Sequence, residues 1–154
     1  MMKKLIFSLF VILPLNLLAQ NYVIKSLGIK EGLSNNHVLS IEQDKRGFMW
    51  FATEEGLNMF DGINFRSFYK EKGKNISLSG NELNGLLDDP VDSILWIATQ
   101  RAGINAYDYG KNKFYTYRKN PKDPNSLITD DITKIMPSSD GNLWICTYWK
   151  GQEC

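Results

Sequence analysis

Short stretches of apolar and β-branched residues alternate with polar turns along most of the chain. The first four such stretches cover residues 38–43, 48–53, 57–60 and 64–69. Alternation with a period of two predicts half-buried β-strands, and the Asp, Gly, Asn and Lys residues between the stretches are typical of turns. The pair Asp61-Gly62 is a strong hairpin signal. No segment sustains a helical periodicity, so the pattern predicts an all-β fold.

The predicted strands belong to an internal repeat, which the tryptophans reveal. The repeated segments are WFAT at 50–53, WIAT at 96–99 and WICT at 144–147, so that successive tryptophans lie 46 and 48 residues apart. A glycine follows each segment, and GLNMFD at 56–61 matches GINAYD at 103–108. Upstream, LSNNHV at 33–38 matches LSGNEL at 78–83, and LITDDI at 127–132 is a weaker third copy. Three copies in register establish the repeat.

Each repeat unit has the strand content of one β-propeller blade. Four short antiparallel strands in a unit of about 40 to 50 residues are the signature of such a blade. Within the first tryptophan strand, alternation places Trp50 and Ala52 on one face and Phe51 and Thr53 on the other. A large residue beside a small one fits the wedge between neighbouring blades. We therefore predict an all-β fold of four-stranded β-propeller blades, two complete and one truncated, in an open, incomplete propeller.

The repeat also divides the chain into segments. Residues 1–20 form the expected signal peptide, and residues 21–31 hold an N-terminal strand that we expect to complete a missing last blade. Blade 1 is predicted at 32–76, blade 2 at 77–125 and a truncated blade 3 at 126–154. An open stack leaves blade faces and a strand edge uncovered. We therefore expect residues 21–154 alone to be marginally stable and prone to association.

The first residues have the order of a secretory signal peptide. Lys3 and Lys4 precede the nearly uncharged run LIFSLFVILPLNLL at 5–18, and the small residue Ala19 follows it. This order predicts export to the periplasm, with cleavage near Gln20. The run is short for a membrane span, so an uncleaved anchor is the less favoured alternative. No second long apolar run occurs in the sequence, and no further membrane span is predicted.

Charge and reactive side chains exclude several function classes. The 18 basic and 17 acidic residues give a formal net charge of +1, so no basic excess is available to bind nucleic acid. His37 is the only histidine, and it precedes a strand, which argues against a kinase phosphoacceptor or a histidine metal cage. Cys146 takes the position of Ala52 and Ala98 and is expected to be a small buried residue. No disulfide with Cys154 is expected, because the two cysteines are diagonal neighbours in the predicted hairpin.

Residues 32–62, GLSNNHVLSIEQDKRGFMWFATEEGLNMFDG, resemble the two-component regulator propeller repeat. The second copy departs from it by one extra residue before Trp96 and by Asp92-Ser93 at the turn. The resemblance implies that the chain belongs to the periplasmic sensor region of a Bacteroidetes hybrid two-component histidine kinase. It also implies that this sensor region detects oligosaccharides. It implies no catalytic residue, cofactor or metal in this chain. The implied partners are a carbohydrate ligand and the missing blades and downstream sensor and kinase domains of a parent protein.

The loops between the second and third strands of each unit vary within a constant frame. In a propeller these loops share a face with the loops that enter each blade, and binding residues concentrate on loops held by a rigid scaffold. An adjacent Tyr and Trp would suit stacking on the apolar face of a sugar. Ordinary loop variation is the alternative. The predicted ligand-binding residues are Glu54, Glu55, Gln100, Arg101, Tyr148 and Trp149.

Two other functions compete with a ligand sensor. The segment SDGNLW at 139–144 is similar to a sialidase Asp-box, although its glycine spacing differs by one, so an exported propeller lyase or glycosidase is one alternative. A pair of catalytic carboxylates could be drawn from Asp61, Asp108 and Asp88, but Asp61 and Asp108 recur as turn residues. Repetition favours a structural role, because an active site needs only one copy. A propeller scaffold that docks another protein is the second alternative. The type of repeat favours the non-catalytic sensor.

Overall fold

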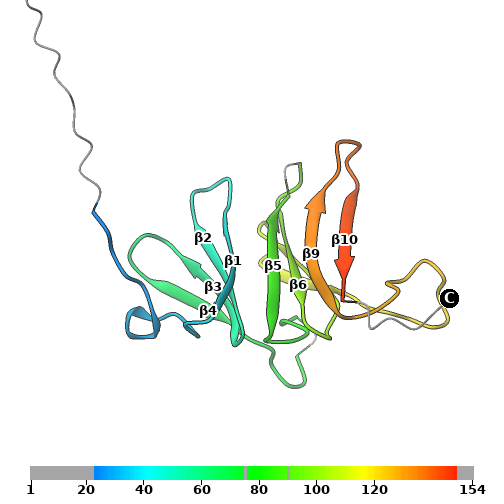
Figure 1. Ribbon diagram of the computed structural model, residues 1–154, viewed down its shortest axis with the longest axis horizontal. Helices are drawn as coiled ribbons and strands as arrows, with labels where there is room; N and C mark the ends of the chain where they lie inside the picture. The colour runs from blue at the N-terminus through cyan, green and yellow to red at the C-terminus, as the bar shows by residue number, and fades with distance from the viewer. Residues whose placement is uncertain (1–22, 75, 90, 149–154) are drawn as a thin grey trace, which may run out of the picture.

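The computed structural model describes residues 23–148 except 75 and 90, and the expected signal peptide lies outside these residues. The described part consists of three antiparallel sheets side by side, preceded by one turn of 3-10 helix (Figure 1). The elements are η1 (Ile29–Glu31), β1 (Val38–Gln43), β2 (Met49–Thr53), β3 (Gly56–Phe60), β4 (Phe65–Phe68), β5 (Leu83–Asp88), β6 (Ile94–Thr99), β7 (Ile104–Asp108), β8 (Lys113–Tyr117), β9 (Ile132–Pro137) and β10 (Leu143–Thr147). The predicted fold class is confirmed, and these sheets do not close into a ring within the described residues.

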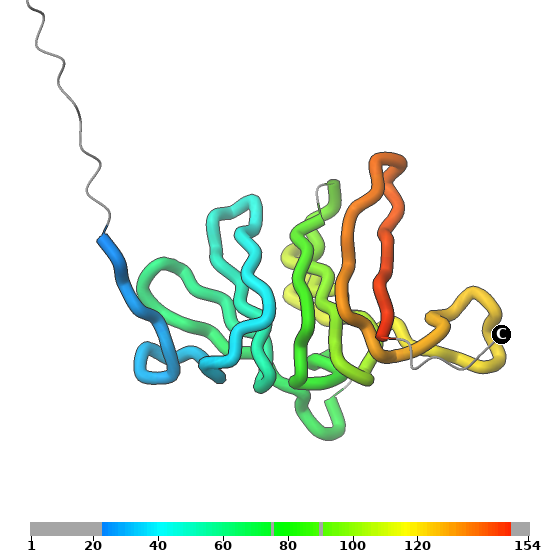
Figure 2. The backbone as a smooth tube through the Cα atoms, viewed as in Figure 1, coloured from blue at the N-terminus to red at the C-terminus, as the bar shows by residue number. Residues whose placement is uncertain are grey.

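Strand order follows the chain within each sheet. The first sheet has the order β1-β2-β3-β4, the second β5-β6-β7-β8, and the third pairs β9 with β10. The four strands predicted for the first copy agree with β1 to β4 to within one residue at each end. The first strands of the three sheets, β1, β5 and β9, are neighbours in space (Figures 1 and 2). Each sheet therefore presents its first strand to the same side of the molecule, which is the inner side of a propeller.

Residues 23–27, where we expected an N-terminal strand, form no strand in this structure. Val23 and Ile24 are 91% and 93% exposed. A β-strand depends on a neighbouring strand for its backbone hydrogen bonds, and none of the three sheets includes this segment. Its part in completing a further blade stays a prediction.

Trp50 lies at the centre of the interface between the first two sheets. Its side chain is fully buried. The ring centroid lies 5.5 Å from that of Tyr107, 6.0 Å from that of Tyr109 and 5.8 Å from that of Phe68. Ala52 belongs to the same cluster. The prediction that Trp50 and Ala52 share a face that packs on the neighbouring blade is confirmed.

Alternation in β6 lets the second sheet serve two interfaces. Leu95 and Ile97 belong to the core cluster shared with the first sheet. Trp96 and Ala98 belong to a second cluster, in which Ile135 of β9 is also buried. A strand covered on both faces by neighbouring sheets loses the exposed polar positions of a surface strand, which explains why β6 reads as a continuous apolar run.

The third sheet departs from this pattern in its exposure. Trp144 is 66% exposed, in contrast to the fully buried Trp50. Cys146 is half-buried, so the expectation that it would be buried like Ala52 and Ala98 is wrong. The two alanines are covered by the next sheet along the chain, and no described strand covers Cys146. Cys154 lies outside the described residues, so the expected absence of a disulfide is not tested.

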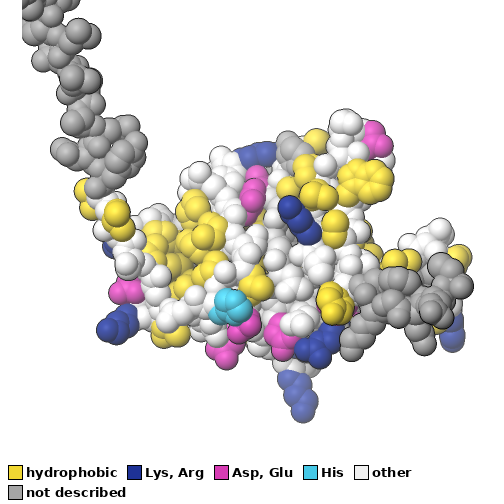
Figure 3. Space-filling view, in the orientation of Figure 1, with side chains coloured by type: hydrophobic (Ala, Val, Ile, Leu, Met, Phe, Trp, Pro, Cys, Tyr) yellow, Lys and Arg dark blue, Asp and Glu magenta, His cyan; other side chains and the backbone are white. Residues whose placement is uncertain are grey.

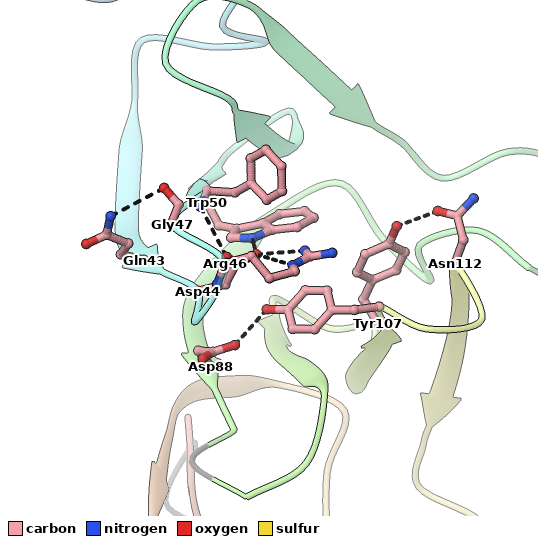
Figure 4. A network of polar contacts seen from close by, with 10 residues as sticks. Gln43, Asp44, Arg46, Gly47, Trp50, Asp88, Tyr107 and Asn112 are labelled. Atoms are coloured by element: carbon pink, nitrogen blue, oxygen red, sulfur yellow. Dashed lines mark hydrogen bonds and ion pairs between the residues drawn. The ribbon is translucent and has the colours of Figure 1, made fainter.

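Asp44 fixes the position of Trp50 through the indole nitrogen. Nε1 of Trp50 donates a hydrogen bond to Oδ2 of Asp44 at 2.9 Å, and Nη2 of Arg46 donates to the same oxygen at 2.7 Å (Figure 4). Burial favours the protonated carboxyl, but the hydrogen bonds from Trp50 and Arg46 outweigh burial and lower the pKa of Asp44. Asp89 holds Nε1 of Trp96 in the same way, at 2.8 Å.

The Asp44 turn also reaches the second sheet. The guanidinium carbon of Arg46 lies 4.1 Å from the ring centroid of Tyr109, a cation–π contact. The hydroxyl of Tyr109 donates a hydrogen bond to Asp88 at 2.8 Å. Burial and this hydrogen bond to a carboxylate raise the pKa of Tyr109. The turn before β2 therefore joins the two sheets at the end of the strands opposite to the loops that follow β2 and β6.

Trp50 and Trp144 are a matched pair for testing the interface. We expect Trp50→Ala to lower the free energy of unfolding by about 3–5 kcal/mol, because it empties a buried site. Trp144→Ala should lower it by less than about 1 kcal/mol, because most of that side chain is already in water. Urea denaturation of both variants measures the difference, and equal losses would contradict the described packing.

The charge of Asp44 can be tested by the variant Asp44→Asn. A pKa lowered in the folded state gives stability that is present above the unfolded value of about 3.9 and is lost as the pH falls through the folded value. We expect Asp44→Asn to lower the free energy of unfolding by about 1–3 kcal/mol at neutral pH. The difference from the unmodified chain should shrink at pH values below about 4. Urea denaturation at several pH values measures it, and a pH-independent difference would refute the assignment.

Candidate functional site

A buried asparagine in the third strand clamps the loop that enters each complete sheet. Oδ1 of Asn58 accepts hydrogen bonds from the backbone nitrogen of Ser34 at 3.0 Å and from Oγ of Ser67 at 2.7 Å, and its Nδ2 donates to Oγ of Ser34 at 2.7 Å. Asn105 repeats the clamp on Ser79, at 3.1 and 2.8 Å. A buried amide whose bonds are all satisfied holds one geometry. The repeated Leu-Ser segment thus owes its position to these clamps.

Backbone hydrogen bonds place the loops that follow β2, β6 and β10 beside the entrance loops. In each case the first loop residue donates its N–H to the carbonyl of the residue that immediately precedes the first strand of the same sheet. The bonds run from Glu54 to His37, from Gln100 to Glu82 and from Tyr148 to Asp131, at 3.3, 2.9 and 3.0 Å. Both sets of loops therefore share one face of the molecule, here called the loop face, as the sequence predicted.

Basic and acidic side chains also pair across the loop face. In the first sheet the basic residue stands before the first strand and the acidic residue in the loop after the second strand, and in the second sheet the two are exchanged. Nδ1 of His37 lies 2.7 Å from Oε1 of Glu54, and Nη2 of Arg101 lies 3.2 Å from Oε2 of Glu82. All four side chains are well exposed, so each pair contributes little to stability. In Figure 3 acidic and basic side chains lie close to the cyan histidine. The loop face is thus densely polar.

Three adjoining hollows open on the loop face, and Arg101 borders all of them. The axial hollow, of about 640 Å³, lies at the start of β1, β5 and β9. A second hollow, of about 500 Å³, lies between the loops of the first two sheets. The third, of about 420 Å³, lies beside the third sheet and shares Asp131 and Tyr148 with the axial hollow. A ligand of several units could extend from one hollow to the next.

The structure brings five of the six predicted ligand-binding residues to these hollows. Those of the first two loops border the second hollow, and those of the second and third loops border the axial hollow. The five are Glu54, Glu55, Gln100, Arg101 and Tyr148. Trp149 lies outside the described residues. The role of these residues in binding stays a prediction.

Sequence reasoning missed four residues of the axial hollow. Asp131 precedes β9, and the other three, Leu39, Asn84 and Thr133, are the second residues of β1, β5 and β9. The three side chains share no chemical property, so composition gives no signal for them. Their common position after Val38, Leu83 and Ile132 in the aligned repeats is the signal that could have found them.

Each of these three residues stands at a β-bulge. Val38 pairs with Thr53 and Ser40 with Ala52, which leaves Leu39 without a partner in the ladder. The register shifts in the same way around Asn84 in the second sheet and around Thr133 in the third. A bulge turns its extra side chain out of the regular alternation. The repeat therefore directs one side chain per sheet toward the axial hollow.

Arg101 has an unusual backbone conformation for its residue type. Its φ is +62°, and among the described residues only Asn112 is another non-glycine with positive φ. The left-handed region costs a β-carbon residue roughly 1 kcal/mol or more. The loop of the second sheet has one residue more than that of the first, and Arg101 stands in this longer loop. The strained residue is the one that borders all three hollows.

Charges around the hollows nearly balance. Arg101 and Asp131 border the axial hollow, and three glutamates oppose Lys70 and Arg101 at the second hollow. No group of three or more potential metal ligands occurs among the described residues. A face with balanced charge and many hydrogen-bonding groups suits an uncharged polar ligand better than a polyanion or a metal ion.

A fourth hollow, on another side of the molecule, has a structural explanation. It measures about 500 Å³ and exposes Trp96 and Tyr117. Between the first two sheets, the equivalent tryptophan, Trp50, is covered by Tyr107 and Tyr109. The fourth hollow thus corresponds to a surface on which sheets pack, and we do not count it as a ligand site.

Comparison with known proteins gives the family context. The family model described as two component regulator propeller matches residues 32–55 and 126–149, in the first and third copies of the repeat. Histidine kinase P4 of Formosa agariphila is 42% identical over 73 residues, which cover 46% of this chain and 5% of the kinase. Within the part of the chain that the structure describes, no helix has the length and apolarity needed to span a membrane.

Solved structures match over most of this chain. The extracellular domain of a protein assigned to a hybrid two-component system of B. thetaiotaomicron is 56% identical, with a TM-score of 0.79 over 85% of this chain. The extracellular domain of a second such system from the same organism is 29% identical, with a TM-score of 0.64 over 82% of this chain. This chain spans 18% of each of the two solved chains.

Strain at Arg101 can be measured with two variants. Glycine adopts positive φ freely, so we expect Arg101→Gly to be more stable than Arg101→Ala by about 1 kcal/mol. At Glu54, which has no positive φ, the order should be the usual one, with Glu54→Ala at least as stable as Glu54→Gly. Chemical denaturation of the four variants gives both differences. An alanine variant as stable as the glycine variant at position 101 would show that no strain is stored there.

Proposed function

The chain carries repeats of the two component regulator propeller family, and we propose that it forms part of the ligand-sensing propeller of a hybrid two-component regulator. In this proposal the propeller is periplasmic, exported by the segment at residues 1–20. It binds oligosaccharides on its loop face and signals to a histidine kinase domain of a longer protein. The two matched extracellular domains and the matched histidine kinase support this assignment.

The observation that carries the proposal is that hydrogen-bonded positions repeat from sheet to sheet, whereas the side chains of the loop face differ. The Asn58 and Asn105 clamps and the Asp44 and Asp89 turns repeat from sheet to sheet. The side chains around the hollows differ in every sheet. A rigid frame that presents varied polar side chains around adjoining hollows is the arrangement expected of a recognition surface.

An oligosaccharide fits the chemistry of the loop face. Gln100 supplies an amide, Asp131 a carboxylate and Arg101 a guanidinium, which together donate to and accept from hydroxyl groups. Tyr148 is exposed and can stack on the apolar face of a sugar ring. The adjoining hollows offer room for more than one ring. These features favour an uncharged polyhydroxylated chain over a small ion.

The alternative of a lyase or glycosidase receives no support from Asp61 and Asp108. Oδ1 of Asp61 accepts hydrogen bonds from the backbone nitrogens of Ile63 and Asn64, and Asp108 is bonded to Lys111. These hydrogen bonds lower the pKa of both carboxyls, so both are ionised at neutral pH. A general acid needs a raised pKa. The two aspartates act as turn residues.

Calorimetric titration of the full chain tests the proposal. The probes are cellotetraose, xylotetraose, mannotetraose and galactotetraose, with tetragalacturonate as a charged comparison. We expect at least one neutral probe to bind and Arg101→Ala to weaken that binding by about tenfold or more. Lys45→Ala, which removes a cation at the opposite end of the strands, should leave the affinity unchanged. Absence of binding to any probe, or an equal loss in both variants, would refute an oligosaccharide site on the loop face.

A further inference from the structure

The β-bulges at Leu39, Asn84 and Thr133 break the side-chain alternation of their strands at the same point in every sheet. The residue before each bulge is apolar and belongs to the frame; these residues are Val38, Leu83 and Ile132. The bulge residue itself changes from leucine to asparagine to threonine. A position that varies in chemistry while its backbone geometry repeats is suited to recognition rather than to packing.

Hydrogen bonds hold two of the bulge residues in place and leave part of their capacity free. Nδ2 of Asn84 donates to the carbonyl of Ile132 at 2.8 Å, and Oγ1 of Thr133 donates to the carbonyl of Cys146 at 3.1 Å. Oδ1 of Asn84 and the lone pairs of Thr133 have no partner among the described residues. Both side chains are therefore pre-oriented and still able to accept hydrogen bonds.

The rim of the axial hollow supplies the remaining groups. Gln100 and Asp131 border the hollow, and their side chains make no hydrogen bond to another described residue. Leu39 and Tyr148 are exposed and provide apolar surface on the same hollow. The hollow thus combines donors, acceptors and an aromatic face in a volume of about 640 Å³.

We propose that the three bulge residues, with Asp131 and Tyr148 at the rim, form an axial subsite that selects one uncharged sugar ring of the ligand. This inference rests on the proposed oligosaccharide-sensing function. A sugar ring presents hydroxyl groups that need both donors and acceptors, and it presents an apolar C–H face for Tyr148 and Leu39. Arg101 and Asp131 both border the hollow, so it offers no net positive charge to attract a carboxylated or sulfated ring.

The subsite gives a role to the repeated bulges, each of which directs one side chain of its sheet toward the axial hollow. Loop residues such as Arg101 and Gln100 lie outside the strand ladders, whereas a bulge residue is directed by the ladder of its sheet. The loops therefore fix where the chain of sugar units lies, and the bulge residues determine which unit enters the axial hollow. One side chain from each sheet contributes to that choice.

The test uses the full chain and the neutral tetrasaccharide that binds it most tightly among the four named above. Asn84→Leu and Asp131→Ala should each weaken binding by about tenfold or more, because each leaves a sugar hydroxyl without its partner. Asn125→Leu in the connector after β8 and Asp92→Ala in the turn before β6 are matched controls, and neither should change the affinity. Thermal melting accompanies each titration. Asp131→Ala should keep the melting midpoint, since its side chain makes no described hydrogen bond.

The outcomes separate the subsite from the function on which it rests. If no tetrasaccharide binds, the proposed function fails and the subsite fails with it. If Arg101→Ala weakens binding but Asn84→Leu and Asp131→Ala bind as tightly as the unmodified chain, the function stands and the axial subsite is wrong. Tighter binding of tetragalacturonate than of every neutral probe would overturn the choice of an uncharged ring.

Discussion

The burial of Trp50 between two sheets is the contact on which the rest of the described structure depends. Its indole fills the wedge between the first and second sheets, and its only polar atom is satisfied by Asp44. The same carboxylate holds Arg46, which lies over Tyr109 of the second sheet. One side chain therefore sets both the spacing and the relative orientation of neighbouring sheets at the end away from the loop face.

At the other end of the strands, buried asparagines hold the backbone of the entrance loops, and the exposed side chains differ from sheet to sheet. Asn58 and Asn105 fix the entrance loops to the third strands. Backbone hydrogen bonds join the loops that follow β2 and β6 to those entrances. The exposed pairs His37–Glu54 and Arg101–Glu82 add little stability to them, so these side chains can change without loss of the fold. The contacts that hold the loops and the side chains proposed for recognition are thus largely separate within each repeat.

The sequence predicts those features of the molecule that depend on the alternation of apolar and polar side chains. It predicts the strands, the shared face of Trp50 and Ala52, and the common face of the loops. It misses the β-bulges at Leu39, Asn84 and Thr133, because a change in hydrogen-bond register leaves no mark in residue type. The burial of Cys146 was predicted wrongly, because burial depends on what covers a strand as well as on the strand itself.

The central claim is that the loop face, and no other surface of the described residues, binds the ligand. Amide chemical-shift mapping of the ¹⁵N-labelled full chain with the best-binding tetrasaccharide tests it most directly. We expect the perturbed amides to cluster at residues 37–39, 53–56, 82–84, 99–103 and 131–133, and the turns at 44–48 and 138–142 to be unaffected. Perturbations centred on those turns, or on the exposed face around Trp144, would contradict it.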